Sequence, residues 1–387
     1  MNAFRTIRKL KRTISMSFLV LFGMACTDTV KAIPPTPPPA KRIKLGLLLD
    51  TSSSMSGLIN QAQSQLWKIV NELATAKCEG VKPELEIALY EYGNSGLPAS
   101  EGYIRMVTPL TDDLDQISAD LFALTTNGGN EFCGRVIQTA TDELDWGAGD
   151  EDLKVLFIAG NEPFNQGQVK PSVACRNAIN KGIKINTIYC GEFNEGLRSG
   201  WKKGADLANG HYMSISHNSK TVYIESPYDN EIDELNTDLN ATYIPYGSLG
   251  HSKKAMQMSE DANSEKYGKQ NKVSRIMSKN SYVYKNTKWD LVDANKEKSF
   301  DLTKIKKEQL PKKMQTMTND QKKAYVAKKT SKRIQINQQI KTLSTKRKMF
   351  VAEKKKAAGE NEVNSLDVAI IKAIHAQAKT KNFTFEN

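Results

Sequence analysis

Short apolar runs alternate with amphipathic stretches along the first half of the chain. The runs 43–50, 85–92 and 153–159 are almost wholly apolar, which is typical of strands buried on both faces of a sheet. Between them, stretches such as 56–76 carry apolar residues at three- and four-residue steps, which predicts helices. This alternation predicts an α/β fold: a Rossmann-like, doubly wound and mostly parallel sheet. The other expected strands are 103–107, 183–189 and 211–215, and the other expected helices are 114–124, 135–144, 172–180 and 195–209.

The pattern changes after residue 216, where apolar runs become rare and lysine becomes frequent. We expect an irregular basic segment over 251–317 and a basic helical tail over 318–387, which together form a C-terminal basic helical extension. Within that tail, a long helix is predicted to about residue 356 and a final one over 366–378. The long helix has a thin apolar stripe that fits a coiled-coil seam or a docking face. The stripe consists of Ile336, Ile340, Leu343 and Phe350.

Charge divides the chain in the same place. Residues 43–250 contain 15 Lys/Arg and 28 Asp/Glu, whereas residues 251–387 contain 32 and 14. The basic part is either a solvated helical face or a surface that contacts an anionic component of the cell envelope. No motif for reading nucleic acid is present, so a specific nucleic-acid partner is not expected.

The N-terminus has the form of an export signal. Five basic residues precede an apolar stretch over 14–25, which is too short to span a bilayer. Cys26 follows directly, and residues 1–26 resemble a bacterial lipoprotein signal, although Gly23 stands where such signals usually have Leu. The alternative is cleavage after Ala32 and simple secretion. We therefore expect an exported protein, either periplasmic, associated with the outer membrane through a lipid anchor only, or secreted.

Residues 27–42 form a proline-rich linker after this signal, which predicts an extended spacer. Four cysteines follow the linker. In an oxidising compartment an even number permits two disulfides, with three possible pairings that the sequence does not distinguish. These are Cys78, Cys133, Cys175 and Cys190.

The first apolar run ends in a loop of oxygen-bearing side chains, Asp50-Thr51-Ser52-Ser53-Ser54, followed by a predicted helix. Serine hydroxyls and a carboxylate on one tight turn suit a hard cation such as Mg²⁺, or Mn²⁺ or Ca²⁺. The plain alternative is a serine-rich helix N-terminus. The pattern D-x-S-x-S at a strand-to-helix turn resembles the metal-ion-dependent adhesion site (MIDAS) of von Willebrand factor A (VWA) domains. The resemblance implies that Asp50, Ser52 and Ser54 are metal ligands.

Two later loops complete such a site in VWA domains, and both depart from the family's pattern here. Loop 126–134 has no threonine after its two glycines, and Glu131 is the strong oxygen ligand near that position. In loop 158–164, Gly160 stands where the family has Asp, with Asn161 and Glu162 just beyond. Two readings remain open: a metal site that uses Glu131, with Asn161 or Glu162 in support, or a degenerate site whose loops are only structural.

The segments 128–134, 159–164 and 239–247 resemble recurrent features of a group of bacterial exported VWA proteins. We therefore assign residues 43–250 to a VWA domain. The resemblance implies a module that binds a protein partner, whose acidic group completes the coordination of the metal. One alternative is an envelope scaffold with a degenerate site that acts through its basic tail. A metal-assisted hydrolase at Asp50 and Glu131 is less favoured, and an enzyme is not expected, because no motif of a catalytic nucleophile is present.

Overall fold

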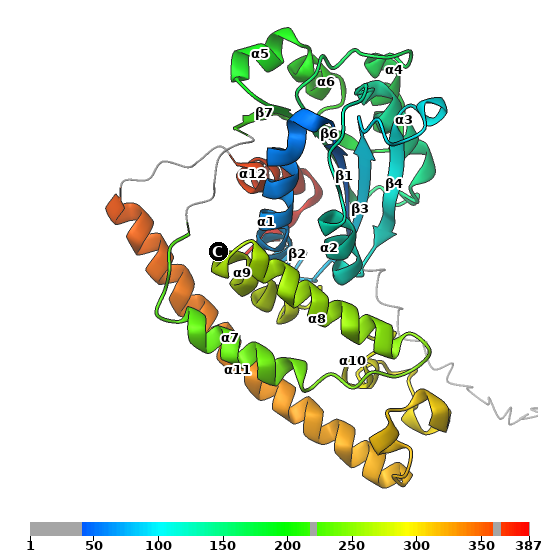
Figure 1. Cartoon of the computed structure of the whole chain (residues 1–387), viewed down its shortest axis with the longest axis vertical. Coiled ribbons are helices and arrows are strands. Elements are labelled where there is room, and N and C mark those ends of the chain that lie inside the picture. The colour runs from blue at the N-terminus through cyan, green and yellow to red at the C-terminus, as the bar shows by residue number, and fades with distance from the viewer. Residues whose placement is uncertain (1–40, 217–222, 359–364, 387) are drawn as a thin grey trace, which may run out of the picture. The chain divides into compact units, whose positions relative to one another are not determined.

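The computed structural model describes residues 41–216, 223–358 and 365–386, and a six-stranded sheet forms the centre of this part (Figure 1). The strand order is β4-β3-β1-β5-β6-β7, in which β4 is antiparallel to β3 and all other neighbours are parallel. The predicted mostly parallel α/β sheet is therefore confirmed. The strands are β1 (Arg42–Asp50), β3 (Glu84–Tyr92), β4 (Ile104–Thr111), β5 (Leu153–Gly160), β6 (Lys184–Cys190) and β7 (Tyr212–Ile215).

The carboxyl ends of the parallel strands meet at one edge of the sheet. Asp50 is paired with Tyr92 of β3, and Gly160 of β5 is paired with Tyr189 of β6. In parallel sheets, ligands bind at this edge, where the connecting loops converge. The register thus brings together the loops in which the sequence predicts metal ligands.

Helices cover both faces of the sheet, because successive side chains of each buried strand point to opposite sides. The apolar residues of β1 alternate between the two cores: Leu47 and Leu49 belong to one, and Leu48 to the other. The first core includes α1, α2 and α12, and the second includes α3, α4 and α6. The helices are α1 (Ser56–Leu73), α2 (Leu114–Phe122), α3 (Cys133–Glu143), α4 (Pro171–Asn180), α5 (Phe193–Arg198), α6 (Trp201–Leu207) and α12 (Leu366–Ala378).

The single helix predicted over 195–209 is wrong, because the structure has two helices there, α5 and α6. Gly200 lies between them with φ of +92°, in the left-handed region that glycine adopts without strain. The sequence contains this glycine, but a periodicity argument alone does not show that it ends a helix.

The C-terminal helix α12 returns to the sheet and lies beside α1 (Figure 1). The side chain of Gln61 in α1 accepts a hydrogen bond from the Leu366 backbone N–H (3.1 Å) and donates one to the Ser216 carbonyl (2.7 Å). The chain then ends in a short strand, β8 (Phe383–Phe385), antiparallel to β2 (Ala76–Cys78). The last residues therefore pack with the sheet, although the sequence pattern grouped them with the basic tail.

The stretch 251–317 is not irregular throughout, and that expectation was wrong for the three helices α8, α9 and α10. α8 has few buried apolar residues, and its buried side chains include Gln257, Glu260 and Ser264. A helix that buries polar residues leaves no apolar stripe in the sequence, so its periodicity is hidden. Together with the flanking helices α7 (Asp229–Asn240) and α11 (Asn319–Ala358), the helices here are α8 (Gly250–Lys266), α9 (Lys269–Lys279) and α10 (Leu291–Ala294).

Buried ion pairs explain the polar interior of these helices. Arg275 of α9 is fully buried, and its guanidinium donates to Asp115 of α2 at 2.8 Å. Lys279 contacts Asp261 at 2.9 Å, and Arg333 of α11 contacts Asp290 at 2.7 Å. Several basic residues are thus internal to the fold rather than solvated, because each has an acidic partner.

The 40-residue helix α11 uses its apolar stripe as a docking face within the chain. Ile336, Ile340 and Leu343 are buried, and the helix contacts α7 and α9. Within the described ranges, no helix is both long and apolar enough to cross a bilayer.

The two disulfides that the cysteine count permitted are not present. Among the described residues all four cysteines are buried without forming a disulfide. Three of their thiols lie against different partners: Cys78 against the Lys381 carbonyl, Cys133 against the Tyr92 hydroxyl and Cys175 against the Gly204 carbonyl. Cys26 and the predicted signal lie outside the described residues, as does nearly all of the predicted linker.

Candidate metal site

The turn from β1 into α1 presents the first set of oxygen atoms. Asp50 is the last residue of β1 and is fully buried. Its Oδ1 accepts a hydrogen bond from the Ser52 N–H at 2.8 Å, whereas its buried Oδ2 has no hydrogen-bond partner among the described residues. An unpaired buried carboxylate oxygen is costly, so this atom calls for a proton or a cation.

Serine and asparagine side chains link the first loop to the third. The Oγ atoms of Ser52 and Ser54 lie 3.2 Å apart. The Asn161 side-chain amide donates to Ser54 Oγ at 3.3 Å, which brings the loop after β5 to the loop after β1. Three of the predicted ligands therefore lie in a continuous chain of contacts.

Glu131 reaches the same point from the second loop. Backbone hydrogen bonds from Asn127 N–H to the Thr51 carbonyl (3.0 Å) and from Ser95 N–H to the Gly128 carbonyl (2.6 Å) hold this loop in place. A Cβ added to Gly93 would lie 2.8 Å from Asp50 Oδ1 and 2.9 Å from Glu131 Cγ. The two carboxylate side chains thus converge beside a position where only glycine fits.

The electrostatics of these loops show that negative charge is concentrated there. Burial, with the nearby charges of Glu131 and Glu162, raises the pKa of Asp50 from 3.8 to about 7, against the lowering effect of its hydrogen bonds from Ser52. Burial, followed by the charge of Glu162, raises the pKa of Glu131 as well. A bound cation would relieve both effects, since it compensates the charge that burial disfavours.

Gly160 explains one departure from the family's pattern in physical terms. A Cβ at this position would lie 2.5 Å from the Tyr92 hydroxyl and 3.0 Å from Asp50 Oδ2. That hydroxyl donates to the Ala159 carbonyl at 3.0 Å and is held in place by it. Aspartate therefore does not fit at position 160, and Asn161 and Glu162 supply the polar atoms of this loop instead.

Five of the six residues predicted as ligands are linked by contacts or by the shared Gly93 position, and Glu162 is connected to them only through its charge. Glu162 affects the pKa of both other carboxyls. Within the described ranges, no three His, Cys, Asp or Glu side chains form a metal-binding cluster, so any site here must include hydroxyl or amide oxygens. This mixture of oxygen donors, with one orphaned carboxylate oxygen, fits a hard cation such as Mg²⁺.

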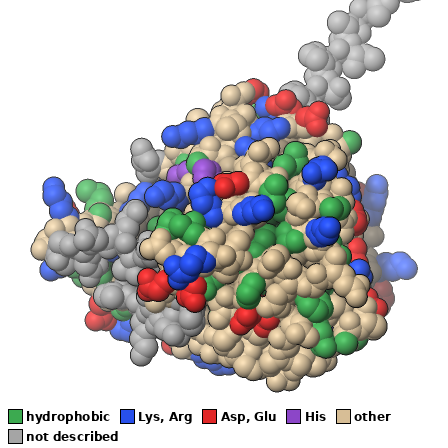
Figure 2. All heavy atoms as spheres, turned by 90° about the horizontal axis from the view of Figure 1, so that it is seen from above, with side chains coloured by type: hydrophobic (Ala, Val, Ile, Leu, Met, Phe, Trp, Pro, Cys, Tyr) green, Lys and Arg blue, Asp and Glu red, His purple; other side chains and the backbone are tan. Residues whose placement is uncertain are grey.

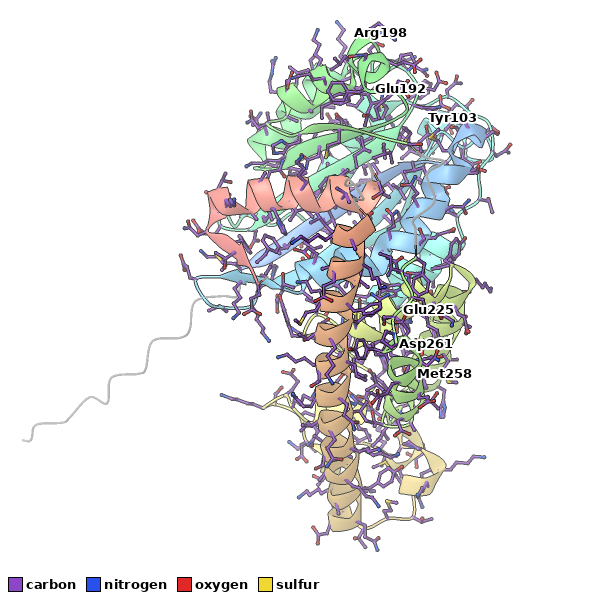
Figure 3. The ribbon with its side chains drawn as sticks, turned by 90° about the vertical axis from the view of Figure 1, so that its left-hand side faces the viewer. Tyr103, Glu192, Arg198, Glu225, Met258 and Asp261 are labelled. Atoms are coloured by element: carbon purple, nitrogen blue, oxygen red, sulfur yellow. The ribbon has the colours of Figure 1, made fainter. Side chains whose placement is uncertain are left out.

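An open pocket of about 610 Å³ lies next to these loops, beyond the carboxyl ends of β5 and β6. Its lining includes Glu162, Glu192 and Glu195, and none of the three forms an ion pair among the described residues. Figure 3 shows Glu192 and Arg198 at the same end of the molecule, and Figure 2 shows acidic, basic and apolar side chains interspersed over that end. The negative charge is therefore local to the pocket.

Sequence reasoning did not find the residues that shape the site without ligating. Gly93 has φ of +80° and admits the two carboxylates, and Tyr92 fixes the end of β5. A glycine directly after a strand was the one available signal, and it is too common to identify a site.

The sheet order, with one antiparallel edge strand and a D-x-S-x-S loop at the end of the central strand, decides the fold. The described sheet and its helices have a VWA-like α/β fold, as the sequence resemblance predicts. No family profile matches the sequence, and no curated protein matches it. Solved structures similar to part of the chain include the SpRpn10 VWA domain, with 16% identity, 45% of this chain and 88% of that chain covered, and a TM-score of 0.34.

Two further similar structures come from a bacterial membrane protein and from a mussel byssus protein. An aerotolerance-related membrane protein from Bacteroides fragilis shares 14% identity over 46% of this chain and 93% of its own, with a TM-score of 0.32. Proximal thread matrix protein 1 from the mussel byssus, described with a zinc-occupied MIDAS motif, shares 14% identity over 46% and 43%, with a TM-score of 0.34.

Proposed function

We propose that this VWA domain is a metal-dependent binding module for a protein partner. Asp50, Ser52, Ser54 and Glu131 would hold one divalent cation, Mg²⁺ or else Mn²⁺ or Ca²⁺, with Asn161 and Glu162 in support. The observation that carries this proposal is the Asp50 carboxylate, whose buried Oδ2 has no hydrogen-bond partner among the described residues and whose Oδ1 faces the same Gly93 position as the Glu131 side chain. When bound, the cation supplies a positive charge that attracts and orients an acidic group of the partner.

The chain's own residues make this binding strictly dependent on the cation. Asp50 and Glu131 face the site, and Glu162 lies close enough to raise the pKa of both. A partner carboxylate brought to these three groups alone would meet like charges in a partly buried environment, which disfavours binding. We therefore expect no measurable affinity for the partner without metal.

The raised pKa values of the nearby cysteine thiols favour a binding role over a catalytic one. Burial raises the pKa of the Cys133 and Cys190 thiols, which makes thiolate formation unfavourable at neutral pH. Ser52 lies in contact with Ser54, which supports a role as a ligand rather than as a nucleophile. The proposal includes export to the cell envelope, with Cys26 as a lipid anchor.

The test is capture of a partner from detergent-solubilised envelope by immobilised residues 40–387, with Mg²⁺ and with chelator. We expect the same protein to be captured with Mg²⁺ only, and to be lost with Asp50→Asn. Ser53→Ala is the matched control, since Ser53 is exposed and lies in the same loop outside the ligand set. Capture that survives both the chelator and Asp50→Asn would overturn the proposal.

A further inference from the structure

The second half of α11 carries a dense positive charge with little acidic compensation. Residues 341–356 contain seven Lys or Arg and one Glu. Only Arg347 of these seven forms an ion pair among the described residues, with Asp229 at the start of α7. The other six basic side chains of this segment therefore lack, in the described part of the chain, the acidic partners that the buried Arg275, Lys279 and Arg333 have.

The lysines lie on one exposed face of the helix. Lys341, Lys348 and Lys355 are exposed and recur every seven residues, close to two helical turns, so they share one side. The opposite side is the docking face, where Leu343 is buried and Arg347 is held by Asp229. Figure 3 shows α11 along the side that faces the viewer, and Figure 1 shows its orange end extending beyond the start of α7.

Two exposed apolar side chains lie within this charged face. Ile334 is 63% exposed and continues the seven-residue series, and Met349 is 61% exposed and lies beside Lys348. A soluble polyanion would neutralise the lysines but leave these side chains in water. A bilayer surface can do both, because its headgroups carry the charge and its interfacial region accepts apolar side chains.

We propose that the outer face of α11, comprising Ile334, Lys341, Lys348, Met349 and Lys355, binds an anionic phospholipid surface. The predicted lipid anchor at Cys26 would place the chain near such a surface, but the inference stands on the helix face alone. It is independent of the metal site, since α11 and the loops at the sheet edge are formed by different parts of the chain.

The test is flotation of residues 40–387, which lack Cys26, with phosphatidylcholine vesicles that contain or lack phosphatidylglycerol. We expect binding only with phosphatidylglycerol, and its loss at high salt. Lys341→Gln, Lys348→Gln and Lys355→Gln combined should weaken binding by roughly 100-fold, at about fivefold per lysine. Met349→Ser alone should also weaken it. The matched control is Lys298→Gln, Lys307→Gln and Lys312→Gln, which removes the same charge from exposed positions outside this face.

Three outcomes would overturn the proposal. Equal loss of binding in both triple variants would show a response to net charge rather than to this face. Binding of heparin or short DNA that depends on the α11 lysines, without binding to vesicles, would assign the face to a soluble polyanion. Absence of binding to both kinds of vesicle would show that this face does not bind phospholipid at all. The metal-induced rise in melting temperature, which the α11 variant should retain, separates these outcomes from failure of the metal site.

Discussion

Asp50 is the residue on which the proposed metal site depends, and its ionisation connects the site to stability. Its pKa of about 7 in the folded chain exceeds its ordinary value of 3.8. The folded state therefore holds a proton between these values that the unfolded state has lost. The resulting stability is present in full below about pH 4 and is lost as the pH rises through about 7.

This direction of the pH dependence can be tested by comparing the stability of the wild type with that of Asp50→Asn in the absence of metal. Asparagine carries no charge, so the variant should be more stable than the wild type near pH 8, by a few kcal/mol at about 1.4 kcal/mol per pKa unit. Near pH 4 the difference should be small. Urea unfolding across this pH range measures it, and a wild type that is the more stable at high pH without metal would refute the burial of an unpaired charge.

At the scale of elements, the sequence predicted the strands well and the short or polar elements poorly. Apolar runs such as Leu153–Gly160 identify buried strands because both faces are covered. The strands β2 and β8 have three residues each and pair across some 300 positions, so no local pattern could reveal them. Asp50, Ser52 and Ser54 lie close together because they belong to one tight turn, whereas Asn161 reaches them from the loop after β5. The requirement for glycine at positions 93 and 160 depends on packing between strands, so it could not be predicted from the sequence.

The placement of α12 has a consequence for the limits of the folding unit. Ile370 and Ile374 of α12 and Phe383 of β8 are almost completely buried in the same core as α1. A chain of residues 40–250 would expose that face, so we expect it to lack a cooperative thermal transition. In the chain 40–387, Ile374→Ala should lower the free energy of unfolding by about 2–5 kcal/mol. A cooperative transition of 40–250 at the melting temperature of 40–387 would show that α12 is dispensable.

At the scale of the whole described unit, the buried ion pair of Arg275 in α9 with Asp115 in α2 joins the helical segment to the helices that cover the sheet. Arg275→Met would leave Asp115 buried without its cation, so the free energy of unfolding should fall by about 3–5 kcal/mol. Lys202→Met, which breaks an exposed pair with Asp206, should cost less than about 1 kcal/mol. Urea denaturation followed by tryptophan fluorescence and circular dichroism measures both. A small effect of Arg275→Met would contradict the network's role in joining the two parts.

The central claim is that oxygen atoms from three loops hold one divalent cation, and direct metal binding tests it. Isothermal titration of residues 40–387 with Mn²⁺ and Mg²⁺ at neutral pH should show one site, abolished by Asp50→Asn, strongly weakened by Glu131→Gln and unchanged by Ser53→Ala. The melting temperature should rise with metal concentration in the wild type but not in Asp50→Asn. Absence of binding at millimolar metal, or binding that survives Asp50→Asn, would show that the three loops meet only for structural reasons.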